Sequence, residues 1–121
     1  MFGTLRDLWE VISIAPRVER DRRRLGPGRL LPQVRRRGLS RRVRTDVERT
    51  RLRTVIRQVD RLFPAGPNCY RRALLEIAVD ARAAAEPLHM GITLGDRAAR
   101  GHAWLESSSD RGSGYDVELR V

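Results

Sequence analysis

The sequence has few of the residues that would place it outside the cell or in a membrane. It holds a single cysteine, so it cannot form the internal disulfide that is typical of oxidising compartments. It contains no run of 18 or more apolar residues, which a membrane-spanning helix would need. The partly apolar start carries Arg6, Asp7 and Glu10, which the core of a signal peptide excludes. We therefore expect a cytoplasmic protein with no membrane span.

Aromatic residues are also scarce, and lysine is absent. Aromatic residues make up 5% of the 121 residues and all hydrophobic residues 40%, so one modest domain with an aliphatic core is expected. All 25 basic residues are arginine, and the formal net charge is +10. Residues 1–66 hold 18 arginines against 7 acidic residues, whereas residues 67–121 hold 7 against 8. An Arg-rich region at 1–66 and a nearly neutral region at 67–121 are predicted. The basic region would attract nucleic acid, acidic membrane or an acidic protein, and charge alone does not choose among them.

Metal and cofactor chemistry has little support in the sequence. One cysteine and two histidines without a local pairing motif do not make a structural zinc site. The glycine-containing stretch at 26–30 lacks the lysine and the following helix of a phosphate-binding loop. We expect neither a metal nor a cofactor.

The Arg-rich region is predicted to be helical. Apolar spacing predicts a helix over residues 1–14, with Pro16 beyond its end and a charged run over 17–24. Glycines and prolines predict a loop from Gly26 to Gly38. A long helix is expected from Ser40, as its cap, to Phe63. Its apolar stripe would consist of Val43, Val47, Leu52, Val55, Ile56, Val59, Leu62 and Phe63.

The neutral region changes from helix to strand. Asn68 is expected to cap a helix from Cys69 to Ala85, with Ala73, Leu74, Ile77, Ala78 and Ala81 facing inward. Strands are predicted at 89–94, 101–106 and 115–121, and polar and apolar residues alternate strictly in the last of these. This order predicts an α+β fold in which the Cys69 helix packs on a small antiparallel sheet.

Cys69 is the strongest candidate nucleophile. In the first turn of a helix, unpaired N–H groups and the positive end of the helix dipole would stabilise its thiolate. Arg71 and Arg72 would add positive charge nearby. The alternative is an inert, buried cysteine that behaves as a small apolar residue, which is the common state of free cysteine.

His102 is the candidate base, because its small neighbours Gly101 and Ala103 would let another element approach the imidazole. The other histidine, His89, is expected to have a packing role. A Cys–His pair needs a third group to orient the imidazole. Asp116 is preferred, since a short hairpin between the second and third strands would place it beside His102. Asp110 falls in the connecting loop, where aspartate is commonly a turn residue.

The segment from Pro64 to Glu106 resembles the transglutaminase-like leader peptidases of lasso-peptide biosynthesis. The matching elements are Pro67, Cys69, Arg72-Ala73-Leu74, Gly91-Ile92 and His102-Ala103-Trp104-Leu105-Glu106. The resemblance extends over roughly residues 64–121. The chain departs from the family pattern at Tyr70, where leucine is common, and in a longer stretch after Glu106.

This resemblance implies a papain-related Cys–His–Asp site on a transglutaminase-like core, formed here by Cys69, His102 and Asp116. The implied reaction is removal of the leader peptide from a ribosomally made precursor. The implied partners are the precursor's leader, a small recognition protein that binds it, and a cyclase related to asparagine synthetase.

Two interpretations from other classes compete with the peptidase. One is a nucleic-acid-binding module built on the Arg-rich region, although its basic helix faces lack interleaved aromatic residues and no recognition motif is visible. The other is an interaction protein that keeps the fold without the activity. Alkylation of Cys69 would separate them, because a low-pKa thiol reacts well below pH 8.

Overall fold

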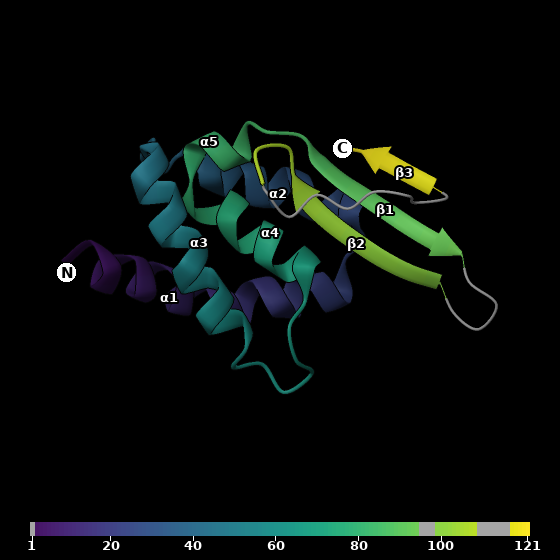
Figure 1. Cartoon of the computed structure of the whole chain (residues 1–121), viewed down its shortest axis with the longest axis horizontal. Helices are drawn as coiled ribbons and strands as arrows, with labels where there is room; N and C mark the ends of the chain where they lie inside the picture. The colour runs from purple at the N-terminus through teal and green to yellow at the C-terminus, as the bar shows by residue number, and fades with distance from the viewer. Residues whose placement is uncertain (1, 95–98, 109–116) are drawn as a thin grey trace. The chain divides into compact units, whose positions relative to one another are not determined.

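The protein forms two compact units, a helical unit (Met1–Ala85) and a sheet unit (Glu86–Val121). The computed structural model describes residues 2–94, 99–108 and 117–121. The helical unit contains five helices and the sheet unit a three-stranded antiparallel sheet (Figure 1), so the predicted α+β class is confirmed. The functional division expected between residues 66 and 67 stays a prediction. No helix in the described part of the chain is long and apolar enough to cross a membrane.

The first helix, α1 (Phe2–Arg24), is longer than predicted because it continues through Pro16. Proline removes one backbone hydrogen bond and crowds the preceding turn, at a cost of about 3 kcal/mol. The same helix face is buried on both sides of this position, at Val11, Ile14 and Val18. Packing of this continuous apolar face therefore outweighs the local break that the proline predicts.

The loop predicted from Gly26 to Gly38 is wrong, because these residues form α2 (Pro27–Leu39). Pro27 occupies the first turn, where a missing N–H costs nothing and the fixed φ favours a helix. Leu30, Leu31 and Val34 follow at helical spacing and are buried. Near its other end, Gly38 packs directly on the Ile77 carbonyl oxygen, and no side chain would fit there.

The long helix predicted from Ser40 to Phe63 is shorter in the structure. Ser40 ends α2 instead, and α3 (Asp46–Asp60) begins after Thr45. The Thr45 hydroxyl accepts from the Glu48 N–H and the Glu48 carboxylate accepts from the Thr45 N–H, which is a reciprocal capping box. The central stripe is buried as predicted, whereas the flanking apolar side chains are exposed. The buried residues are Leu52, Val55, Ile56 and Val59, and the exposed ones are Val43, Val47 and Leu62.

The helix predicted from Cys69 to Ala85 divides into α4 (Cys69–Val79) and α5 (Ala81–Ala84). Asp80 lies between them with extended backbone, and its side chain accepts from the Arg82 N–H to start α5. The inward positions Ala73, Leu74, Ile77 and Ala78 are buried as predicted, and Ala81 is half-buried. Helix α4 packs against α1, α2 and α3 within the helical unit.

The sheet unit consists of β1 (Leu88–Leu94), β2 (Ala99–Leu105) and β3 (Val117–Arg120) in the order β2-β1-β3. All pairs are antiparallel. The hairpin predicted between the second and third strands is therefore wrong, since β3 pairs with β1 and leaves β2 at one edge. Alternation identifies a strand and its two faces, but not which neighbour the strand will choose. Packing of the Cys69 helix on this sheet stays a prediction.

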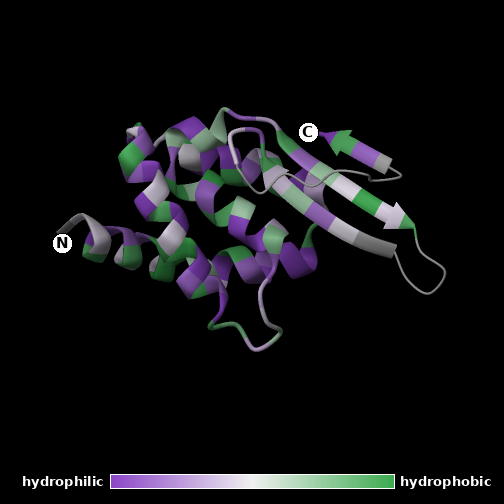
Figure 2. Ribbon diagram, viewed as in Figure 1, coloured by the Kyte–Doolittle hydropathy of each residue, from purple (hydrophilic) through white to green (hydrophobic). Residues whose placement is uncertain are grey.

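Buried arginines are a feature of the helical unit, whose helices alternate between hydrophilic and hydrophobic positions (Figure 2). Arg44, Arg49 and Arg71 are at most 5% exposed, and each contacts a buried aspartate. Arg44 binds Asp7 at 2.7 Å and Arg49 binds Asp80 at 2.9 Å. A buried charge is tolerated when a partner and hydrogen bonds compensate its lost hydration. Much of the arginine in this region therefore has a structural role.

Candidate active site

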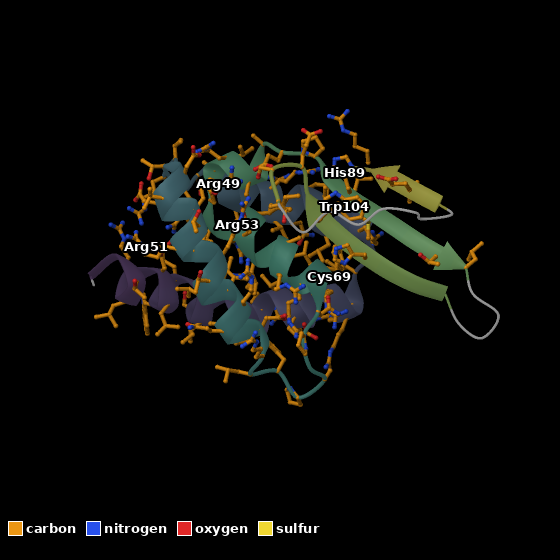
Figure 3. The ribbon with its side chains drawn as sticks, viewed as in Figure 1. Arg49, Arg51, Arg53, Cys69, His89 and Trp104 are labelled. Atoms are coloured by element: carbon orange, nitrogen blue, oxygen red, sulfur yellow. The ribbon has the colours of Figure 1, made fainter. Side chains whose placement is uncertain are left out.

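Cys69 is half-buried at the first residue of α4 (Figure 3). The Asn68 side chain accepts a hydrogen bond from the Arg71 backbone N–H at 2.9 Å, so Asn68 is the helix cap that the sequence predicts. The first N–H groups of a helix have no partner in the preceding turn, and the helix dipole is positive at this end. The Cys69 thiol therefore lies at the positive end of the α4 dipole.

The turn before Cys69 is held by Asp60, the last residue of α3. Its side chain is buried, and one carboxylate oxygen accepts from the Asn68 N–H at 3.0 Å. Gly66, in the same turn, has φ of 84°, which side chains other than glycine rarely adopt. The position of the nucleophile thus depends on a buried carboxylate and a glycine that precede it.

Arg71 connects this turn to the rest of the helical unit. Its guanidinium donates to Asp60 Oδ1 at 2.7 Å, to Glu19 Oε2 at 3.0 Å and to the Gly66 carbonyl at 2.7 Å. It also lies 4.0 Å from the centre of the Phe63 ring. Arg71 joins α1, the end of α3 and the start of α4 at one point.

Arg71 and Arg72 are both ion-paired, so part of the positive charge expected from them is offset. Arg72 contacts the second carboxylate oxygen of Asp60 at 2.9 Å, while Arg71 contacts the first. Glu19 supplies a further negative charge. Hydrogen bonding from Arg22 and Arg71 lowers the pKa of Glu19 to about 2, although burial opposes the shift. Two carboxylates therefore offset part of the positive charge that the sequence places near Cys69, and an effect of these arginines on the thiol stays a prediction.

Tyr70, which follows Cys69, differs from the leucine expected by resemblance. Its hydroxyl is buried and has no hydrogen-bond partner in the described part of the chain. Burial raises the pKa of Tyr70, and the nearby Arg22 opposes that shift. The ring therefore serves as an apolar filler with an unsatisfied polar end.

His102 lies in β2 of the sheet unit, half-buried and directly opposite Gly91 of β1. Its ring stacks on Trp104, with centroids 5.5 Å apart and planes 24° from parallel. His102 and Trp104 thus share a face of the sheet, as their spacing in a strand predicts. Gly91 adds no side chain beside the imidazole, and its own position is buried.

His89 stacks on the same tryptophan, with centroids 5.5 Å apart and planes 9° from parallel. Its Nε2 is also 3.7 Å from Glu106 Oε1, and Arg120 approaches the same oxygen at 3.4 Å. These contacts fit the packing role that the sequence suggested for His89. Trp104 (Figure 3), at 5% exposure, therefore supports both histidines.

The structure does not place every residue of the predicted site. Asp116 and Asp110 lie outside the described residues, so neither is placed. Cys69 belongs to the helical unit and His102 to the sheet unit, and their pairing stays a prediction. Within the described residues, no group of three or more histidine, cysteine, aspartate or glutamate side chains could hold a metal ion.

Sequence reasoning missed Asp60 and Gly66 as parts of this site. A signal for Asp60 was present, because it follows Ile56 by four residues and so falls on the apolar stripe of α3. A carboxylate in such a position requires buried donors. Gly66 gave a weaker signal, since its place between Pro64 and Pro67 indicates a turn without indicating a positive φ.

Comparison with known families agrees with this architecture. Residues 12–118 match the Transglutaminase-like superfamily, and the chain belongs to that family. The superfamily includes cysteine peptidases. No curated protein and no solved structure matches the chain.

Proposed function

We propose that this protein is a cysteine peptidase that removes the leader peptide from a ribosomally made precursor during lasso-peptide maturation. The main support is Cys69, a half-buried thiol at a capped helix start, in a chain of the Transglutaminase-like superfamily. The His-Ala-Trp-Leu-Glu strand adds to this support, because His102 lies on a sheet face with a tryptophan against it.

In the proposed reaction, the Cys69 thiolate attacks the peptide carbonyl carbon and forms a tetrahedral intermediate. Backbone N–H groups at the start of α4 would stabilise its oxyanion. Protonated His102 gives its proton to the departing amine as the C–N bond breaks. His102 then takes a proton from water, which attacks the thioester and releases the carboxylic acid and the free enzyme. Asp116 is proposed to orient His102.

The proposed partners are the leader, a small recognition protein that presents it, and a cyclase related to asparagine synthetase that acts afterwards. A leader held by a partner reaches Cys69 at a high effective concentration, which suits a small peptidase. Many arginines in the Arg-rich region already make ion pairs with carboxylates of the same chain. These include Arg6, Arg20, Arg22, Arg23, Arg42, Arg44, Arg49, Arg51 and Arg53. Contacts to an acidic partner would therefore involve other arginines, such as Arg17, Arg37 and Arg41.

The test is mass spectrometry of a candidate precursor after incubation with this protein and its recognition partner. Wild type should release the intact leader, and Cys69→Ala should release none while its circular dichroism spectrum is unchanged. Full turnover by Cys69→Ala would reject the nucleophile. Folded wild type that leaves the precursor uncut in the presence of the partner would indicate an inactive interaction protein.

The same assay tests the third residue. Asp116→Asn should slow cleavage strongly, because an amide does not stabilise the imidazolium charge. Asp110→Asn should leave the rate nearly unchanged. The reverse pattern would reassign the third residue to Asp110.

A further inference from the structure

A cleft of about 440 Å³ lies in the helical unit between α1 and the C-terminal end of α2. This volume is in the range of pockets that hold small ligands or side chains. It is far larger than the roughly 15 Å³ that a cavity needs to hold one water molecule. Its lining residues are Ser13, Ile14, Arg17, Arg37, Ser40 and Arg41.

Three arginines in this cleft lack an internal counter-ion. In the described part of the chain, no carboxylate makes an ion pair with Arg17, Arg37 or Arg41. The buried arginines of the same unit differ, since each of them contacts an aspartate. Asp21 attracts the Arg37 guanidinium but is itself 3.4 Å from Arg20.

The electrostatics of Arg37 reflect this crowding of like charge. Its pKa is lowered, first by burial and then by Arg17 and Arg41, while Asp21 acts in the opposite direction. A bound anion would relieve this repulsion, because each guanidinium would gain the opposite charge that it lacks. The cleft therefore favours a negatively charged occupant.

The donors that this cleft offers are guanidinium groups. Ser13 Oγ donates to the Glu10 carbonyl at 2.9 Å and Ser40 Oγ to the Arg37 carbonyl at 2.7 Å, so both hydroxyl protons are already used. A guanidinium binds a carboxylate through two parallel hydrogen bonds. None of the six lining residues is aromatic, so the cleft has no platform on which a nucleic-acid base could stack.

A purely structural role explains only part of this cluster. Cations at the C-terminal end of a helix offset its dipole by about 0.3–1 kcal/mol each, which suits Arg36 and Arg37 at the end of α2. Arg17 comes from α1, seven residues before the end of that helix. A second cleft is lined by Arg20, Arg23 and Arg24 but also by Glu19, which forms a 3.1 Å ion pair with Arg23 inside it. The first cleft differs because no carboxylate is among its lining residues.

We infer that the cleft formed by Arg17, Arg37 and Arg41 is an oxyanion site that takes the carboxylate side chains of an acidic peptide segment. The identity of that peptide as the precursor's leader rests on the proposed function, whereas the binding itself does not. In that case the cleft would hold a part of the substrate other than the peptide bond that is cut.

The test measures binding of a synthetic Gly-Ser peptide that contains paired glutamates, with a matched peptide in which glutamine replaces them. Isothermal titration of the full chain carrying Cys69→Ala avoids any turnover. The glutamate peptide should bind at low ionic strength and the glutamine peptide should not. Arg37→Gln should weaken binding at least tenfold, and Arg37→Lys should have a smaller effect because it keeps the charge but loses the paired hydrogen bonds.

Arg36→Gln is the matched control, since Arg36 is exposed, adjacent to Arg37 and outside the cleft. It should change binding by less than threefold. Equal losses in Arg36→Gln and Arg37→Gln would overturn the site in favour of diffuse attraction. Arg41→Gln replaces Arg37→Gln if the latter misfolds. Absence of glutamate-peptide binding would also overturn the proposal, as would Arg37-dependent binding of inorganic phosphate or duplex DNA alone. Arg37-dependent peptide binding without precursor cleavage would reject the peptidase and retain this site.

Discussion

The two units of this protein carry their candidate site residues in different ways. In the helical unit, Cys69 follows a turn held by buried ionic contacts from Asp60 and Arg71. In the sheet unit, His102 rests on one tryptophan and on strand pairing, opposite a glycine. The nucleophile is thus positioned by a charged network and the proposed base by an aromatic stack. This difference predicts that substitutions in the two units will affect stability and catalysis unequally.

The largest expected effect is in the helical packing, at Gly38. A Cβ at this position would overlap the Ile77 carbonyl and crowd Ala84, so α2 and α4 would have to separate. Gly38→Ala should lower the free energy of unfolding by about 3 kcal/mol or more, at the upper end of overpacking costs. Urea unfolding followed by circular dichroism would measure this loss.

Gly28 provides the control, because it lies in the same helix and a Cβ added there would meet nothing within 4 Å. Gly28→Ala should be neutral or stabilise by up to about 1 kcal/mol. Peptide-resolved hydrogen exchange should show faster exchange in residues 27–84 for Gly38→Ala. Equal stability of the two variants would show that α2 does not pack closely on α4.

A second prediction concerns the acid sensitivity of the charged network. The pKa of Glu19 in the folded protein is about 2, against an ordinary value of 4.5, chiefly through hydrogen bonding from Arg22. A lowered pKa stabilises the fold above pH about 4.5, and this contribution is lost as the pH falls toward 2. This contribution of Glu19 to the free energy of unfolding is on the order of 3 kcal/mol.

Urea unfolding at pH 6 and pH 3 would test this contribution. Glu19→Gln should be less stable than wild type at pH 6, and the difference between the two should shrink at pH 3. Asp21→Asn is the control, because it removes a carboxylate from a different face of the same helix, where Asp21 pairs with Arg20 at 3.4 Å, and it should not reproduce the effect of Glu19→Gln. A constant difference between Glu19→Gln and wild type across this range would contradict the assignment. Glu76 should contribute the opposite pH dependence of stability, because burial raises the pKa of its carboxyl group.

The third prediction separates catalysis from packing in the sheet unit. His102 and His89 both lie with ring centroids 5.5 Å from Trp104, so each is a packing control for the other. His102→Ala should lower kcat/KM for precursor cleavage by about a hundredfold, the scale of a lost acid–base group. His89→Ala should stay within a few fold of wild type.

Comparable rate losses in these two variants, with folded protein in both, would mean that His102 acts only through the aromatic stack. A large loss in His89→Ala alone would move the base to β1. Either result would remove the difference drawn above between the two units.

The sequence alone was sufficient for features that depend on local chemistry. The Asn68 cap, the strands and the buried centre of α3 follow from side-chain type and spacing, and the structure confirms them. The sequence also indicated Cys69 and His102 as candidate site residues. In both cases the indication came from neighbouring residues alone, namely a helix start around the cysteine and small residues around the histidine. The pairing of these two residues and the roles of Asp116 and Asp110 stay predictions.

Tertiary structure decided whatever depends on distant residues. Pro16 stays inside α1 and residues 27–39 form a helix because their apolar faces are buried against other helices. Strand β3 pairs with β1 rather than β2, a choice that alternation within one strand does not specify. Asp60 and Arg71 meet at the turn before Cys69 although they are eleven positions apart in the sequence. A local pattern fixes which face of an element is apolar, but burial energy is shared among all packed elements, so only the assembled fold selects the partners.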